Sequence, residues 1–504
     1  YKDYFAISEP LKRISSHRLL AIRRAESEGY IRVDISPDKE KTLDKLARRF
    51  LRADNDVAYQ VELAMEDSYK RLLKPAIETE FAASSKEKAD AEAIRVFATN
   101  LRQLLLESPL GQKRVLALDP GFRTGCKVVV LSAQGDLLHH TVVFLNTMQA
   151  AQTLQELLHI YKVQAIAIGN GTASRETEQM VRHAIEPIDE KPQVFVVSES
   201  GASVYSASKL AREEFPDEDV TVRGAVSIGR RLMDPLTELV KIDPKSIGVG
   251  QYQHDVNQPR LGESLQQTVE SVVNHVGVDV NTASRHLLTY ISGLGPALAQ
   301  NIVDYRAEHG AFPSRKALLK VPKMGTKTFE QAAGFLRVTD SDMPLDNSAV
   351  HPERYHLVEQ MARDLGCSVA DLMRDAELRK QINLGKYISD EVGLPTLTDI
   401  MHELEKPSRD PRTQIEEFRF DDSVHTIDNL QEGMVLPGIV TNISNFGAFV
   451  DLGVHKDGLI HISEMANRRI TDPNEIVRLH QHVRVRVIAI DRARGRIQLS
   501  LKQV

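Results

Sequence analysis

The sequence contains little that would cross-link it or hold it in a membrane. It has two cysteines in 504 residues, and these, Cys126 and Cys367, lie far apart along the chain. A disulfide framework is therefore not expected, and a reducing cytoplasm is the simplest setting. No apolar run approaches the roughly 18 residues of a membrane-spanning helix, and no Cys/His cluster has the spacing of a zinc site. We expect a cytoplasmic protein without a membrane partner.

An excess of charge is also missing. The chain has 64 Lys and Arg residues against 70 Asp and Glu, a formal net charge of −6, which argues against a uniformly basic surface. Any binding of nucleic acid must therefore come from local basic patches. Hydrophobic residues make up 42% and charged residues 27% of the chain, as in ordinary globular proteins. A chain of 504 residues is too long for one core, so three or more domains are expected.

The first part of the chain, residues 1–111, is predicted to be helical. Residues 43–50 and 91–106 place their apolar side chains on one helical face each. Ser84 and Ser85, ahead of Glu87, predict a helix start. The chain begins at Tyr1 with neither a methionine nor a signal-peptide pattern, so we expect an upstream region in the complete protein.

Residues 112–245 change to a pattern of short apolar strands. Strands are predicted at residues 115–118, 126–131, 137–144, 165–168 and 193–197, and helices at 149–160, 174–185, 204–214 and 222–240. A hairpin meander followed by alternating helices and strands predicts a mixed sheet flanked by helices.

This order of elements is similar to the RNase H-like fold, in its YqgF/RuvC resolvase branch. Nucleases of that branch hold Mg²⁺ or Mn²⁺ between carboxylates, and the resemblance puts those acids at Asp119, Glu199 and Asp234, the last within the final helix. Thr237 stands where the branch usually has a fourth acid. The alternative interpretation is a degenerate domain, in which these acids cap loops and helices or pair with arginines. No cofactor is predicted unless the nuclease interpretation holds.

Two similar glycine turns follow a connector with a helix at residues 246–282. They lie within residues 283–340 and are marked by Gly293 and Gly295 in the first turn and by Lys323, Gly325 and Lys327 in the second. The pair resembles a tandem helix-hairpin-helix, in which backbone amides at a helix start face a phosphate. The basic second turn predicts contact with the nucleic-acid backbone. The first turn has no basic residue beside it, so it is either a similar contact or a packing element.

The remaining chain divides into a helical spacer and a small β domain. Residues 341–415 are predicted to be helical and to end in a charged, proline-rich linker at 406–412, so we expect the last domain to move relative to the rest. Residues 430–504 alternate apolar and polar residues in short runs between turn residues. That pattern predicts five short strands in a barrel.

The sequence of this barrel resembles an S1 RNA-binding domain of the oligonucleotide-binding class. By that resemblance the base-contacting positions are Phe446, Phe449 and His461, with Asp491 and Arg496 on the adjoining edge and Arg484 and Arg486 as further cations. Aromatic rings beside cations hold single-stranded nucleic acid by stacking and by attraction of the backbone. The alternative interpretation is that both phenylalanines belong to the barrel core and His461 is an ordinary surface residue.

Taken in order, these units resemble the Tex family of bacterial transcription accessory proteins across the whole chain. The expected fold is multidomain α+β, with helical regions around an RNase H-like mixed α/β domain, a tandem helix-hairpin-helix and a C-terminal five-stranded OB-fold (S1) barrel. The resemblance implies binding of RNA or single strands with little sequence specificity. Single- or double-stranded DNA and the transcription machinery are further candidate partners. Family members carry an additional N-terminal helical portion, and the alternative function is a metal-dependent, structure-selective nuclease.

Overall fold

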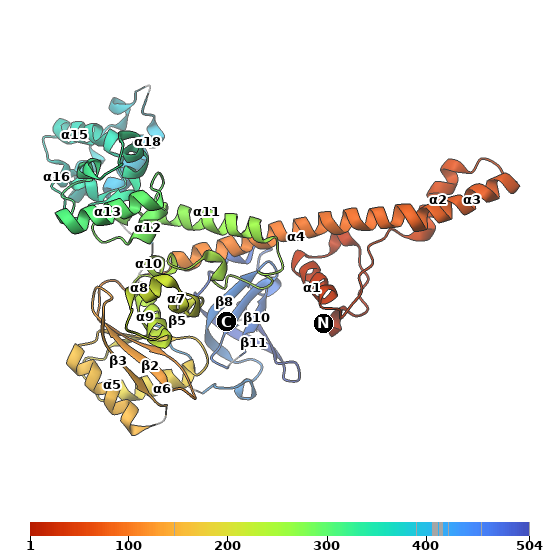
Figure 1. Ribbon diagram of the computed structural model, residues 1–504, viewed down its shortest axis with the longest axis horizontal. Helices are drawn as coiled ribbons and strands as arrows, with labels where there is room; N and C mark the ends of the chain where they lie inside the picture. Colours follow the sequence, from red (N-terminus) through yellow and green to blue (C-terminus); the bar gives the residue numbers. More distant parts are fainter. Residues whose placement is uncertain are drawn as a thin grey trace.

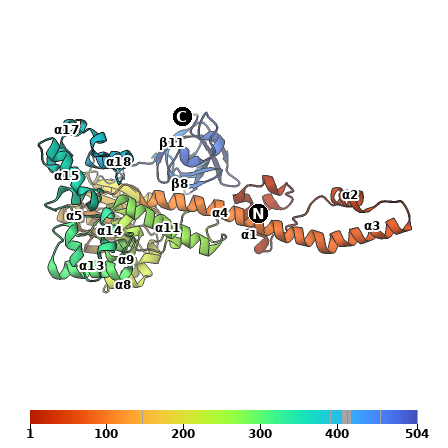
Figure 2. The same ribbon diagram turned by 90° about the horizontal axis from the view of Figure 1, so that it is seen from above.

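A long helix, α4 (Lys74–Leu105), connects the parts of the molecule (Figure 1). The computed structural model describes residues 1–145, 147–389, 391–405, 412, 417–421, 423–454, 456–502 and 504. One half of α4 packs into the body, and the other half projects away from it with α2 (Lys39–Phe50) and α3 (Asp56–Ser68) at its far end (Figures 1 and 2). The shorter helix α1 (Ser16–Ser27) lies between the projection and the C-terminal barrel (Figure 1).

The predicted helix start at Ser84 is wrong, because α4 continues through it. The hydroxyls of Ser84 and Ser85 donate to the carbonyls of Phe81 and Ala82, at 3.4 and 3.2 Å. In this way each serine satisfies its side chain inside the helix. The helix contains no glycine, and its single proline, Pro75, lies just after a π-helical segment, Tyr69–Leu73, through which α4 continues from α3.

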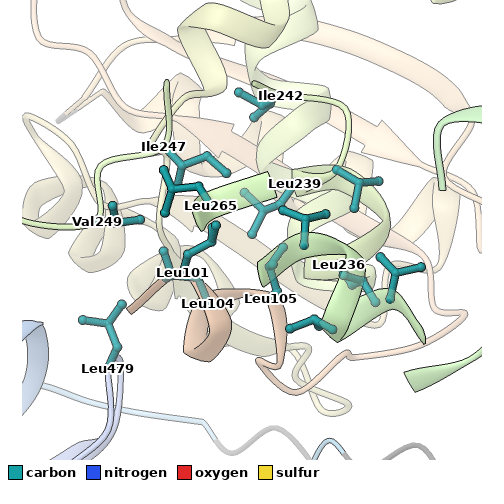
Figure 3. Packing of buried hydrophobic residues seen from close by; sticks show 14 of the residues in the cluster. Leu101, Leu104, Leu105, Leu236, Leu239, Ile242, Ile247, Val249, Leu265 and Leu479 are labelled. Atoms are coloured by element: carbon teal, nitrogen blue, oxygen red, sulfur yellow. The ribbon is translucent and has the colours of Figure 1, made fainter. Parts of the chain in front are cut away.

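The buried half of α4 is the centre of the largest hydrophobic core. Leu101, Leu104 and Leu105 lie on one helical face and are almost fully buried. They pack against Leu265 of α11 (Gln258–Val276) and Leu239 of α10 (Pro235–Leu239), as Figure 3 shows. This core also includes residues of the hairpin region and of the C-terminal barrel. The helix therefore fixes those units relative to one another.

The mixed sheet has the strand order β3-β2-β1-β4-β5. β1 (Val115–Asp119), β2 (Cys126–Leu131) and β3 (Leu137–Val143) are antiparallel, whereas β4 (Ala165–Gly169) and β5 (Gln193–Val197) run parallel to β1. Helices α5 (Met148–Tyr161) and α6 (Ser174–Ile185) cover one face, and α9 (Val220–Met233) covers the other. Short helices α7 (Ala202–Ala207) and α8 (Lys209–Glu214) precede α9. The expected RNase H-like arrangement is confirmed.

The hairpin region consists of α12 (Arg285–Thr289), α13 (Pro296–His309), the 3-10 segment Arg315–Lys320 and α14 (Thr326–Ala332). A parallel pair, β6 (Val278–Asp279) and β7 (Leu336–Arg337), joins its two ends. The following helices, α15 (Tyr355–Asp364), α16 (Val369–Arg374), α17 (Ala376–Lys380) and α18 (Leu394–Glu405), have a core of their own. Arg315, 1% exposed, links the two groups by donating to the carbonyls of Leu336 and Val350.

The C-terminal domain is a closed barrel in the order β10-β12-β11-β8-β9, which confirms the predicted five strands. The strands are β8 (Val435–Ser444), β9 (Gly447–Asp451), β10 (Gly458–His461), β11 (His482–Asp491) and β12 (Arg496–Ser500). Among the residues described, no helix is long and apolar enough to span a membrane.

The barrel is docked on the body, although the sequence pattern predicts a domain that moves relative to the rest. The buried Asn100 of α4 donates to the carbonyls of Val249, at 2.8 Å, and of Ile443 in β8, at 3.1 Å. Gln103, one turn further along α4, accepts from the backbone N–H of Leu479, at 2.6 Å. Most of the predicted linker, residues 406–411, lies outside the described residues. The sequence pattern of a linker says nothing about contacts that the following domain makes with a distant helix.

Candidate nucleic-acid interface

Three strands of the barrel present one outer face. Leu459 of β10 lies between Phe449 of β9 and Gln498 of β12 in the register. Because side chains alternate along a strand, these three point outward, while their neighbours Val450, Ile460 and Leu499 are buried in the barrel. His461 is two residues beyond Leu459, and Arg496 is two residues before Gln498. His461 and Arg496 therefore lie at opposite ends of the same face, which we call the barrel face.

The two predicted aromatic residues form a pair at one end of the barrel face. The rings of Phe446 and Phe449 are 6.0 Å apart in an edge-to-face arrangement, and both are half-buried. Gly447 between them has φ +156°, and a Cβ at that position would collide with the carbonyl oxygen of Ile460. The glycine thus allows the close approach of β9 to β10 that brings the rings together. Neither ring belongs to the barrel core.

Two further predicted residues, His461 and Asp491, accept hydrogen bonds from the backbone. His461 is exposed, and its Nδ1 accepts from the backbone N–H of Ser463, at 3.2 Å, which orients the ring. Asp491 accepts from the N–H of Arg494, at 3.0 Å, and so holds the β11–β12 turn.

Arg484 and Arg486 lie on β11, which borders β8 on one side and β12 on the other. In the register, Arg484 faces Pro437 and Arg486 faces Val435, near the start of β8. Phe446 follows the opposite end of that strand, which finishes at Ser444. On its other side β11 pairs with β12, where Arg486 faces Ser500, next to the row of His461, so Arg486 lies beside the barrel face, whereas Arg484 precedes the residues of β11 that pair with β12.

The N-terminal segment contacts both ends of the barrel face, which the sequence analysis missed. The ring of His17, in α1, lies 4.3 Å from the ring of Phe446. At the other end Asp3 forms an ion pair with Arg496, at 3.1 Å. The pairs join residues far apart in the chain, and no local pattern in the sequence signals them.

The two glycine turns are equivalent in structure. Gly293 has φ +84° and Lys323, at the same place in the second turn, has φ +68°. Leu294 and Met324 follow them and are buried. Gly295 and Gly325 are both exposed, and each precedes a helix, α13 or α14, that has no side-chain cap. Both helix starts therefore leave backbone amides uncapped by side chains, and the imperfect sequence repeat corresponds to a structural one.

The surroundings of the two turns differ. A Cβ on Gly293 would come within 3.0 Å of Gln331 in α14, so the first turn also packs against the second hairpin. Lys323 and Lys327 of the second turn are exposed. The second turn is therefore the better placed of the two to meet a phosphate.

The three acids of the mixed sheet are not assembled into one site. Asp119 ends β1 and Glu199 follows β5, and burial raises the pKa of both carboxyls, with the charge of Asp119 adding to the effect on Glu199. A Cβ on Gly171 would collide with the Glu199 carboxylate, so this loop needs its glycine. Asp234 instead pairs with Arg412, at 2.6 Å. Among the described residues, no group of three or more His, Cys, Asp or Glu side chains could hold a metal ion.

Asp234 also lies outside a continuous final helix, contrary to the prediction for residues 222–240. The helix α9 ends at Met233, and Asp234, with φ −154° and ψ 102°, caps α10 by accepting from the N–H of Thr237 at 3.3 Å. The cause is Pro235, because a residue that precedes proline is disfavoured in the helical conformation. The carboxylate is therefore used as a helix cap and an ion-pair partner.

Models of known protein families match most of the chain. Residues 1–97 match the Tex central region-like model and residues 113–233 the Tex protein YqgF-like domain. A helix-hairpin-helix motif matches residues 273–337, and the S1 RNA binding domain matches residues 429–502. An HHH domain model also matches residues 343–412, for which the sequence analysis offers no chemistry.

Several curated proteins are similar along the whole chain. The transcriptional accessory protein Tex of Neisseria gonorrhoeae is 50% identical over 100% of this chain and 67% of its own length. The protein tex of Bordetella pertussis is 48% identical over 100% of this chain and 66% of its own length. The chain thus spans about two thirds of these relatives. Among solved structures, that of GSP13 from Bacillus subtilis covers 14% of this chain and 56% of its own, with 38% identity and a TM-score of 0.14.

Proposed function

This chain belongs to the Tex family, and on that premise we propose that it binds RNA or other single strands through the barrel face and acts as an accessory factor in transcription. Its S1 and helix-hairpin-helix domains are nucleic-acid-binding domains. The specific proposal is that the S1 barrel supplies most of the affinity and the hairpins supply backbone contacts.

The observation that carries this proposal is the pair of half-buried rings on an outer face with a histidine and an arginine. Phe446 and Phe449 are held edge to face, and His461 and Arg496 lie on the same face. Base–aromatic stacking contributes roughly 1–3 kcal/mol per base and tolerates any base, because every base has a π-face. Such a face binds single strands with little sequence preference.

The second hairpin supports the same proposal by adding cations at a helix start. Lys323 and Lys327 are exposed and flank Gly325, the residue before α14. Lysines in this position attract phosphates irrespective of sequence, and the affinity they add falls as salt rises.

A binding titration tests the proposal. We expect Phe446→Ala with Phe449→Ala to weaken the binding of a fluorescein-labelled oligouridylate at least tenfold, because stacking of roughly 1–3 kcal/mol per base is removed. The control is Phe50→Ala with Tyr59→Ala, which removes two exposed rings from α2 and α3. Affinity equal to that of the control would refute binding by the barrel face.

A metal-dependent nuclease at the mixed sheet receives less support. Asp119 and Glu199 are neighbouring carboxyls, but Asp234 is paired with Arg412, so the described residues do not fit a two-metal centre. Incubating the protein with branched and single-stranded DNA over a range of Mg²⁺ and Mn²⁺ concentrations tests this alternative. Cleavage that Asp119→Asn abolishes would establish it, and no cleavage is expected.

A further inference from the structure

We propose that residues 2–18 form a second wall beside the barrel face and bind the same nucleic-acid strand with their own cations. We call these residues the N-terminal wall. The inference rests on the proposed function, since it adds a contact surface to the barrel face.

The N-terminal wall touches the barrel face at both of its ends. Asp3 pairs with Arg496, and His17 lies against Phe446. In the strand register these two barrel residues lie on either side of the row that contains Phe449. The segment that joins Asp3 to His17 therefore links the two ends of the face, and both views place the N-terminus and α1 beside the barrel (Figures 1 and 2).

The end of the wall that continues into α1 is anchored to the body. Leu19, Leu20 and Ile22 of α1 are buried, and α1 packs on α4. Glu92 of α4 accepts hydrogen bonds from both Ser16 and Asn445, the residue before Phe446. A surface that is already ordered loses little entropy when a ligand arrives. The α1 end of the wall and the barrel thus present one preformed surface.

The wall carries two exposed cations. Its two acids are engaged, because Glu9 pairs with Arg18 and Asp3 with Arg496. Lys12 and Arg13 are exposed, and neither has an ion-pair partner among the described residues. The residues on either side of them, Leu11 and Ile14, are partly buried against the core, so the two cations face solvent. Exposed cations on a segment that contacts an aromatic platform at both ends add attraction for the phosphates of a stacked strand.

His17 supplies a further ring. Burial, and then the charge of Arg18, hold the pKa of His17 below its usual value, so the imidazole is neutral at neutral pH. The imidazole covers one side of Phe446. Among the described residues, Phe449 contacts no ring other than Phe446.

The same contacts allow an opposite interpretation, in which the wall blocks the face. The best support for blocking is the Asp3–Arg496 ion pair, because the Asp3 carboxylate binds Arg496 as a phosphate would. That pair is exposed, with side chains 53% and 61% accessible, so it is readily exchanged for a phosphate. The unpaired Lys12 and Arg13 favour binding, since a blocking segment needs no free cations.

Binding titrations with labelled oligouridylate distinguish the two. We expect Lys12→Ala with Arg13→Ala to weaken binding about tenfold and to reduce the slope of log Kd against log salt by about 1.4, roughly 0.7 for each phosphate that is no longer neutralised. The matched control is Lys45→Ala with Arg52→Ala, which removes the same charge from exposed positions on and next to α2. Affinity equal to that of the control, or tighter, overturns the inference.

A second measurement separates failure of this inference from failure of the proposed function. Phe449→Ala is titrated in parallel, and oligonucleotides with 4-thiouridine are cross-linked to the unaltered protein. We expect cross-linked peptides from both the barrel face and residues 2–18. If Phe449→Ala weakens binding while the wall variants match the control and only barrel peptides cross-link, the wall inference alone is wrong. If Phe449→Ala also has no effect, the proposed function is wrong.

Discussion

The barrel face and the acidic edge of the mixed sheet both match positions that a family uses for function, yet their side chains are in opposite environments. On the barrel face, rings and cations lie at the surface, and nearby acids are held in exposed ion pairs. At the acidic edge, Asp119 and Glu199 are half-buried and their pKa values are raised, while Asp234 is engaged by Arg412. A residue at a motif position can bind a ligand only where the surrounding structure leaves its side chain available.

Two single substitutions give the largest contrast between these regions. We expect Phe449→Ala to weaken binding of a single-stranded oligonucleotide by about 1–3 kcal/mol, the value of one stacked base. Glu199→Gln, at the acidic edge, is expected to leave the affinity unchanged. Fluorescence anisotropy at fixed salt measures both. A larger loss with Glu199→Gln than with Phe449→Ala would reverse the comparison.

The next largest effect is expected on the free energy of unfolding, when the attachment of the barrel to α4 is weakened. Asn100→Ala removes both hydrogen bonds that its amide donates, and leaves the carbonyls of Val249 and Ile443 without that donor. We expect a loss of about 1–2 kcal/mol in the free energy of unfolding, measured by urea denaturation.

Thr99→Ala is the control for this variant, because the hydroxyl of Thr99 bonds only the carbonyl of Arg95 in its own helix, at 3.0 Å, among the described residues. An Asn100→Ala protein as stable as the control would mean that the barrel is not held through this contact.

The second hairpin is expected to contribute less than the barrel face. Lys323→Ala with Lys327→Ala should weaken binding of the same oligonucleotide severalfold and reduce its salt dependence, because two exposed cations are removed. Lys39→Ala with Lys45→Ala removes the same charge from α2. If the hairpin variant loses more affinity than Phe449→Ala, the hairpins rather than the barrel supply most of the binding.

The acidic edge is expected to show the smallest effect, in the pH dependence of stability. Burial raises the pKa of Asp119 and Glu199, so the folded state binds their protons more tightly than the unfolded chain. The cost of burying the charged forms is full at pH 7, shrinks as the pH falls through the raised folded-state pKa values, and is gone below the ordinary values near 4.

We therefore expect Asp119→Asn with Glu199→Gln to raise the midpoint of thermal unfolding at pH 7, and this gain to vanish toward pH 4. Asp217→Asn, at an exposed carboxyl, is the control. A midpoint that falls at pH 7 would show that the two charges stabilise this edge, as they would if it bound a cation.

Local sequence patterns were sufficient to predict most helices and strands. They failed where contacts with residues distant in the chain determine the structure. The five strands of the mixed sheet and the Phe446–Phe449 pair around Gly447 agree with the structure. The helix start at Ser84 was predicted from a capping pattern, but the serines bond within α4. The linker at 406–412 predicted movement, but Asn100 and Gln103 hold the barrel from 300 residues or more away in the sequence.

By itself the sequence determined the order of the units, the glycine turns and the residue types that can bind nucleic acid, because strand alternation, helical spacing and backbone conformation are local properties. The tertiary structure alone decided which of those residues are available. It placed His17 against Phe446, Asp3 against Arg496 and Arg412 against Asp234. Each is a contact between groups distant in the chain, and its free energy depends on a separation and a burial that exist only after folding.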